Sequence, residues 1–250
     1  AKIAPWLKRN KLKNFGTILD LLNSDIVFDV AGVSFIDGRE KFLPFNILSI
    51  FPFLLHKRKV IKLSQAMGPF NNLINRSSAN IVLNKCTKVF ARGHTTMHNL
   101  EKLKNKKNFS LAPDITFSLR SSDLNIFNKR RNKYIAIAPS SLVMKKSKKY
   151  VNEMVKIIKE LQLDGFEIKF IIHSWRKSRF SRNNDLIVAK KINSQLKHKI
   201  ELLGLNKNSM EIRKEISNFQ LIIVSRFHAM ISALCTATPL LVIGWSHKYK

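Results

Sequence analysis

The chain has 250 residues, of which 45% are hydrophobic, so it can bury a sizeable core and does not have the composition of a disordered protein. Its 45 Lys and Arg residues against 16 Asp and Glu residues give a formal net charge of +29. Such a charge attracts nucleic acids, anionic membranes or anionic small molecules without distinguishing them. The basic runs are spread along the chain without a stacking-aromatic, zinc or winged-helix pattern, so nucleic acid is not expected as a partner.

The two cysteines, Cys86 and Cys235, lie in apolar stretches outside any redox motif, which argues against a disulfide framework and predicts a reducing compartment. The longest apolar run, residues 42–55, contains two prolines and is shorter than the ~20 residues of a membrane span. The first residues also lack the apolar core of a signal peptide. We therefore expect a cytoplasmic protein, and we leave open a peripheral contact of its basic faces with the anionic inner face of the cell membrane.

Predicted strands and helices alternate through the first half of the chain. In chain order the predicted elements are a helix at 10–23, a strand at 25–35, a buried helix at 42–55, a strand at 59–63, a helix at 71–86, a strand at 88–91, a helix at 95–103 and a strand at 108–111. Polar, charged and aperiodic residues follow at 120–133, which makes this segment the best candidate for a linker.

The same alternation starts again after the linker. Strands are predicted at 134–138, 167–172, 200–203, 221–224 and 239–243, and helices at 148–163, 184–196, 208–218 and 229–237. The pattern predicts an α/β protein of two Rossmann-like parallel-sheet halves facing a cleft: an N-terminal domain at 1–120, a linker at 121–133 and a C-terminal domain at 134–250. Because a βα architecture usually closes with a helix and this chain stops just after a predicted strand, the C-terminal domain is expected to be truncated.

Residues 221–245 form a predicted strand, turn, helix and strand with polar side chains at the first turn. Arg226 and His228 lie where the strand ends, and ligands of doubly wound sheets bind at the carboxyl ends of strands, where a helix N-terminus can hold an anion. The alternative is structural: the arginine pairs with a nearby carboxylate and the histidine caps the helix. The position favours an anion-binding and proton-transfer site.

Arg92 occupies the same kind of strand-exit turn in the first half, and two arginines facing one cleft would clamp a phosphate or carboxylate. Asp37 and Asp114 also follow predicted strands and are typical N-cap residues, although the glycines near Asp37 leave a general-base role open. His94 and His98 have the spacing of zinc ligands, but without the glutamate of a metalloprotease they are interpreted as structural or surface histidines.

Several ligand-binding motifs are missing from the sequence. It contains no GxGxxG fingerprint, no P-loop, no GxSxG elbow and no DxD-like pair. This absence argues against NAD, ATP and metal-bound sugar nucleotides as ligands.

Together these segments resemble the polysaccharide pyruvyl transferase family. The most specific match is Ser225-Arg226-Phe227-His228, the small-residue helix, Pro239, Ile243-Gly244-Trp245 and Lys248. Further matches are the 65–69 turn, the Arg92 turn, and Asp114 before Thr116-Phe117, so the resemblance covers about residues 25–250. Two departures are the early glycine-rich turn, which here is Ala31-Gly32-Val33-Ser34, and Gly93, which stands where the family commonly has an acidic residue.

The resemblance implies a GT-B-like fold truncated at both ends of the chain, and transfer of a pyruvyl group from phosphoenolpyruvate to a sugar of a surface polysaccharide or its lipid-linked precursor, giving a pyruvate ketal. Arg92, Arg226, Phe227, His228 and Lys248 would bind substrate. His228 would be the acid that protonates the enol carbon, and Asp37 a weaker candidate for the base that deprotonates the sugar hydroxyl. By this logic neither a metal nor a cofactor is needed, since arginines and backbone dipoles carry the developing charge.

Two other functions remain open on the sequence. One is a GT-B-type glycosyltransferase in which Arg226 holds the diphosphate of a nucleotide sugar and His228 acts as base. The other is a non-catalytic basic module that binds nucleic acid or an anionic membrane.

Overall fold

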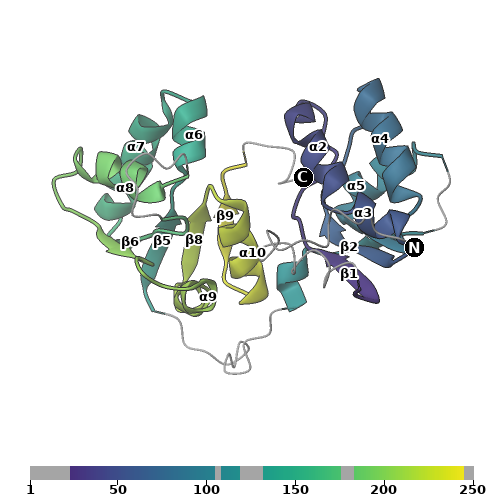
Figure 1. Ribbon diagram of the computed structural model, residues 1–250. Coiled ribbons are helices and arrows are strands. Elements are labelled where there is room, and N and C mark those ends of the chain that lie inside the picture. Colours follow the sequence, from purple (N-terminus) through teal and green to yellow (C-terminus); the bar gives the residue numbers. More distant parts are fainter. Residues whose placement is uncertain (1–22, 105–107, 119–131, 176–182, 245–250) are drawn as a thin grey trace, which may run out of the picture. The chain divides into compact units, whose positions relative to one another are not determined.

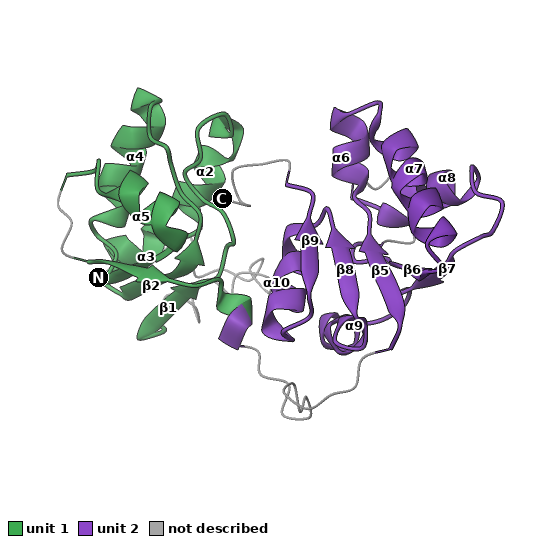
Figure 2. Cartoon of the chain, turned by 180° about the vertical axis from the view of Figure 1, so that it is seen from behind, with its two compact units in different colours: residues 1–116 green, residues 117–250 purple. Residues whose placement is uncertain are grey.

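The computed structural model describes residues 23–104, 108–118, 132–175 and 183–244. The predicted helix at 10–23, most of the predicted linker and Lys248 lie outside these residues. The chain divides into two compact units, residues 1–116 (unit 1) and 117–250 (unit 2) (Figure 2). Among the helices described, none is long and apolar enough to cross a membrane.

Unit 1 is built on a four-stranded parallel sheet in the order β1-β2-β3-β4 (Figure 1). The strands are β1 (Ile26–Asp29), β2 (Lys59–Gln65), β3 (Lys88–Arg92) and β4 (Phe109–Ala112). The connecting helices are α2 (Leu43–Leu48), α3 (Phe51–Leu55), α4 (Leu73–Leu83) and α5 (Gly93–Leu100), with short 3-10 turns at Glu40–Phe42 and Ile115–Ser118. One apolar cluster joins the sheet to the four helices.

A charged pair is buried inside unit 1. Lys62 is fully buried and forms an ion pair with Asp29 on the neighbouring strand. Burial alone would raise the pKa of Asp29, yet the ammonium group of Lys62 and the amide of Ala31 hold this pKa below its usual value. Removal of Asp29 would leave the buried ammonium group of Lys62 without its counter-ion, which makes the pair a structural element of the β1–β2 edge.

Unit 2 is built on a five-stranded parallel sheet in the order β7-β6-β5-β8-β9. The strands are β5 (Tyr134–Ala138), β6 (Glu167–Ile171), β7 (Glu201–Leu203), β8 (Leu221–Val224) and β9 (Leu240–Val242). The helices are α6 (Ser141–Lys146), α7 (Tyr150–Leu163), α8 (Asp185–Asn193), α9 (Ser209–Ile216) and α10 (Phe227–Cys235). The chain starts at the central strand, builds outward on one side and returns to the other, so the order of the strands reverses between β5 and β8.

The alternation of side chains along β5 explains why both faces of this sheet are covered. Ile135 and Ile137 pack into a cluster with α7 and α8. Ala136 and Ala138 point the other way, into a cluster with α9 and α10. Because strand side chains alternate between faces, a strand buried on both sides is apolar throughout, and the small alanines let α9 and α10 approach closely.

Three sequence expectations need correction. The segment 42–55 is not one buried helix but two short ones, and four of its ten large apolar residues are exposed. Pro52 lacks the N–H that would donate to the carbonyl of residue 48, so the helix stops and restarts. The strand predicted at 25–35 ends at Asp29, whose carboxylate accepts a hydrogen bond from the amide of Ala31. The helix predicted at 229–237 begins at Phe227, so Phe227 and His228 belong to its first turn.

Candidate functional site

The carboxyl ends of β5, β6 and β8 bring polar residues of unit 2 together. Ser140 and Ser141 follow β5, His173 follows β6, and Arg226 follows β8. Because β5 and β8 are neighbours at the point where the strand order reverses, their connections diverge and leave room at this edge for a ligand. The predicted Arg226 turn therefore lies at the switch point of unit 2.

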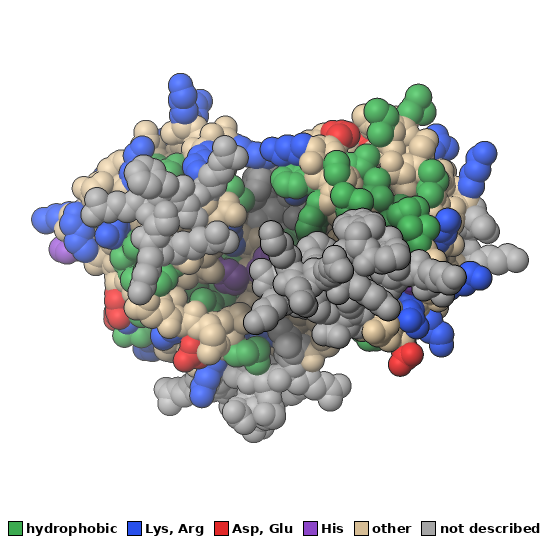
Figure 3. All heavy atoms as spheres, viewed as in Figure 1, with side chains coloured by type: hydrophobic (Ala, Val, Ile, Leu, Met, Phe, Trp, Pro, Cys, Tyr) green, Lys and Arg blue, Asp and Glu red, His purple; other side chains and the backbone are tan. Residues whose placement is uncertain are grey.

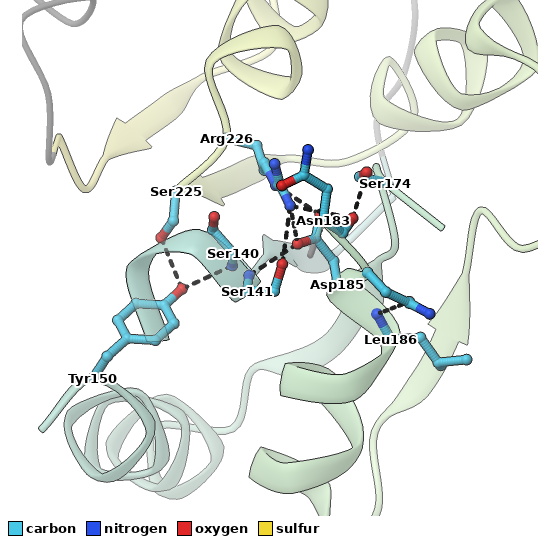
Figure 4. A network of polar contacts seen from close by, with 10 residues as sticks. Ser140, Ser141, Tyr150, Ser174, Asn183, Asp185, Leu186, Ser225 and Arg226 are labelled. Atoms are coloured by element: carbon cyan, nitrogen blue, oxygen red, sulfur yellow. Dashed lines mark hydrogen bonds and ion pairs between the residues drawn. The ribbon is translucent and has the colours of Figure 1, made fainter. Parts of the chain in front are cut away.

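Arg226 is held by a carboxylate from another helix (Figure 4). Its Nε donates to Asp185 Oδ2 at 2.7 Å, and its Nη2 pairs with Asp185 Oδ1 and approaches Ser141 Oγ at 3.2 Å. The Asp185 side chain is fully buried. Burial raises its pKa, while the guanidinium of Arg226 and the amide of Ser141 oppose that rise. Arg226 thus forms the ion pair with a nearby carboxylate that the structural alternative predicted.

A second set of hydrogen bonds fixes the turns after β5 and β8. The hydroxyl of Tyr150, at the start of α7, donates to Ser225 Oγ at 2.9 Å and accepts from the amide of Ser140 at 3.2 Å (Figure 4). Burial raises the pKa of Tyr150, so the phenol stays protonated at neutral pH. The two turns at the switch point are therefore locked to one another by a buried side chain, which keeps Arg226 in place.

His228 has a histidine partner. The rings of His228 and His173 are nearly parallel, with centroids 6.5 Å apart, and Phe227 packs edge-on against His228 at 5.5 Å. His228 is exposed and His173 is only partly so. Burial, followed by the charges of His228 and Arg226, lowers the pKa of His173 to about 4. His173 is therefore neutral at physiological pH.

The first turn of α10 points amide groups toward this edge. Arg226 is the N-cap residue, and its own side chain makes no capping hydrogen bond. The first backbone N–H groups of a helix have no partner within the helix, and together with the helix dipole they favour an anion. An anion at this position would have Arg226 and His228 beside it.

Unit 1 has its own arginine at a strand end. Arg92 closes β3, and its Nη1 donates to Asp114 Oδ2 at 2.9 Å. Burial alone would raise the pKa of Asp114, but hydrogen bonds from Thr116 and the charge of Arg92 hold it below its usual value. A side-chain methyl on Gly32 would sit 3.8 Å from Arg92 Nη1, so the β1 turn, Arg92 and Asp114 lie together in unit 1.

Asp37 binds the start of α4. Its Oδ2 accepts from the amides of Asn71 at 2.6 Å and Asn72 at 3.2 Å, and its Oδ1 accepts from Asn75 Nδ2 at 2.6 Å. Three donors give this carboxylate a structural task, but the N-cap alternative is wrong, because the N-cap of α4 is Asn72. Its general-base role stays a prediction.

The sequence did not single out His173 or Asp185. A signal for His173 exists, because it directly follows a predicted strand, as the Arg226 turn does. Asp185 carries no such signal, since it begins a helix and reaches Arg226 only through tertiary packing. His94 and His98 are exposed on α5, and His98 lies 3.6 Å from Glu101, consistent with surface histidines.

Comparison with solved structures identifies the fold. The UDP-GlcNAc 2-epimerase of Methanocaldococcus jannaschii is 14% identical, with a TM-score of 0.58 over 92% of this chain and 64% of that one. The S. aureus MnaA–UDP co-structure is 13% identical, with a TM-score of 0.54 over 94% of this chain and 62% of that one. This chain thus spans less than two thirds of each of these proteins. The likeness places it among α/β proteins built from two Rossmann-like halves.

The family follows from a more specific match. The model of the family described as polysaccharide pyruvyl transferase matches residues 2–247, nearly the whole chain. The chain belongs to the polysaccharide pyruvyl transferase family. A search of curated proteins found no match.

Proposed function

We propose that the protein transfers a pyruvyl group from phosphoenolpyruvate to hydroxyls of a sugar in a surface polysaccharide or its lipid-linked precursor, forming a pyruvate ketal. The observation that carries the proposal is the combination of Arg226, His228 and the α10 N-terminus at the switch point of a family member. The donor has a carboxylate and a phosphate, and both are anions that a guanidinium and helix amides bind well. We also propose a cytoplasmic location, where cysteines such as Cys86 and Cys235 stay reduced.

Arg226 is proposed to hold the donor with the edge of its guanidinium that does not face Asp185. The Nε–Nη2 edge is paired with that carboxylate. Pairing fixes the plane of the guanidinium before substrate arrives, so less side-chain freedom is lost on binding. Arg92 of unit 1, Phe227 and Lys248 are proposed as further substrate-binding residues.

His228 is proposed as the acid. Protonation of C3 of the enol makes C2 electrophilic, and one sugar hydroxyl adds to C2. A second hydroxyl then forms the other C–O bond as the C2–phosphate bond breaks and inorganic phosphate leaves. One hydroxyl proton is balanced by the proton taken up at C3, and the other leaves with phosphate. Asp37 remains the weaker candidate for the base, because its carboxylate already accepts three hydrogen bonds.

The test compares two histidines of unit 2. We expect His228→Ala to lower pyruvyl transfer by about a hundredfold or more, the usual contribution of a general acid, while circular dichroism stays unchanged. His198→Ala, at an exposed position away from the switch point, is the matched control and should keep full activity. Transfer is measured with phosphoenolpyruvate labelled in the pyruvyl group.

Two results would contradict the proposal. Full activity of His228→Ala would remove this side chain from the mechanism. Label moving from a nucleotide sugar, with none moving from phosphoenolpyruvate, would replace pyruvyl transfer by glycosyl transfer.

A further inference from the structure

Unit 1 exposes a cluster of large apolar side chains on two neighbouring helices. We call the α2–α4 face the surface formed by Phe42, Phe45, Leu48, Leu73 and Ile74, each of which is at least half exposed. Phe45 is 68% exposed and Leu48 67%. The helices α2 and α4 pack against each other, and Figure 3 shows hydrophobic side chains gathered over α2, α3 and α4. Exposed apolar clusters of this kind mark interaction surfaces.

Basic residues outnumber acidic ones around the face. Residues 37–100 contain two acidic residues, Asp37 and Glu40, against ten basic ones, of which Lys62 and Arg92 form ion pairs with Asp29 and Asp114. Lys41 lies directly at the face, with its Nζ 5.3 Å from the centre of the Phe42 ring. The apolar face is therefore combined with positive charge.

The face also has a recess. A half-open pocket of about 210 Å³ is lined by Arg39, Phe42 and Phe45 together with the 31–36 segment. Aromatic walls with a guanidinium at the rim suit a group that is apolar at one end and anionic at the other.

We propose that the α2–α4 face docks unit 1 on an anionic phospholipid surface. Its aromatic and aliphatic side chains would enter the boundary between headgroups and acyl chains, and Arg39 and Lys41 would meet the lipid phosphates. A second copy of the chain is a poorer occupant, because a symmetric contact would bring two equally basic surfaces together. Nucleic acid is also poorer, since aliphatic side chains add nothing to phosphate contacts. The docking does not depend on pyruvyl transfer, but its recess adjoins the turn beside Arg92, because the 31–36 segment lines both.

Vesicle sedimentation with the full chain tests the apolar part. We expect binding to phosphatidylglycerol-containing vesicles and weak binding to pure phosphatidylcholine. Phe45→Gln/Leu48→Gln should weaken the anionic-vesicle partition by about tenfold or more, because two apolar side chains no longer leave water. The matched control is Phe166→Gln/Leu163→Gln, an exposed Phe–Leu pair at the end of α7 in unit 2, which should bind as wild type does.

A charge pair tests the electrostatic part. Arg39→Gln/Lys41→Gln should weaken binding several-fold and reduce its salt dependence, at about 1 kcal/mol of attraction per basic residue near the surface. Lys190→Gln/Lys191→Gln, an exposed basic pair on α8 of unit 2, removes the same charge elsewhere and should change little.

Four results would overturn the proposal: no binding to anionic vesicles, wild-type binding by the Phe45/Leu48 variant, equal losses in the unit 2 controls, or a concentration-dependent dimer that this variant abolishes. RNA is also added as a competitor for the vesicles. If RNA displaces the wild type and the Phe45/Leu48 variant from the vesicles equally easily, the surface is assigned to nucleic acid instead. Release of phosphate from phosphoenolpyruvate with a soluble saccharide acceptor is measured in parallel. Failure of docking and failure of transfer are then distinguishable.

Discussion

The ionisation of His173 links the site of unit 2 to its stability. The pKa of this histidine is lowered from 6.5 to about 4, chiefly by burial. Between these values the unfolded chain binds a proton that the folded chain does not, so stability is lost as pH falls from 6.5 toward 4 and is unaffected above 6.5. We expect His173→Gln to reduce this loss, by at most about 3 kcal/mol. Urea unfolding of wild type and variant at both ends of the range measures it.

His198→Gln is the control for that experiment and should follow the wild-type pH profile. A His173→Gln protein that loses as much stability as wild type on acidification would show that His173 is not the group responsible.

At the same scale, sequence could propose Arg226 and His228 but not their partners. A strand followed by Ser-Arg-x-His predicts a turn at which ligands bind, and this prediction requires only the local order of residues. Asp185 meets Arg226 through the packing of α8 beside α6, which no local pattern encodes. The same holds for Asp37, whose three donors lie at the start of α4, more than thirty residues along the chain.

At the scale of elements, the alternation of strands and helices could be predicted from the sequence, and the departures from it have specific local causes. The strand 134–138 and the strand 221–224 coincide with β5 and β8, because a run of apolar residues between turn signals has one reading in an α/β chain. The prediction of one buried helix at 42–55 was wrong, because its apolar content was interpreted as burial and Pro52 was not interpreted as a helix break. α6 was missed since its six residues are too short for a period to register.

The turn between β2 and α4 gives a prediction about packing. Gly68 has φ +90°, and a Cβ there would lie 2.6 Å from Asn99 Cβ on α5, whereas Gly38, at φ +77°, has nothing within 4 Å. Both alanine substitutions strain the backbone, but only Gly68→Ala also forces α5 from the turn. We expect Gly38→Ala to cost about 1 kcal/mol and Gly68→Ala about 3 kcal/mol or more in urea unfolding. Equal costs would mean that the turn and α5 separate without penalty.

At the scale of the whole molecule, the division into two parallel α/β halves followed from the alternation of elements, but the strand order did not. The pairing of Ile135 with Leu221 joins residues far apart in the chain, and several parallel orders would satisfy the same apolar pattern. The switch point between β5 and β8 was therefore expected from the fold class and not from the order of apolar residues. The match to the family, and not the alternation of elements, shows the family to which the chain belongs.

The net charge of +29 predicts how the stability of the whole chain responds to salt. Exposed lysines such as Lys145, Lys146, Lys148 and Lys149 lie close together and repel, which destabilises the compact state at low salt. Buried pairs such as Arg226–Asp185 are screened much less than exposed charges. Raising NaCl from about 20 mM to about 300 mM should therefore raise the unfolding temperature by a few degrees, since the Debye length shrinks below ~10 Å.

Screening has a signature that separates it from other effects of salt. The rise in unfolding temperature should level off once the Debye length falls below the spacing of the lysines. A neutral sugar at equal osmolality should not produce the same rise, because it does not screen charges. A fall in unfolding temperature over the same range would show that attraction between exposed charges, such as Lys207 with Glu215, outweighs the repulsion of the excess. Calorimetry distinguishes these outcomes without any substitution.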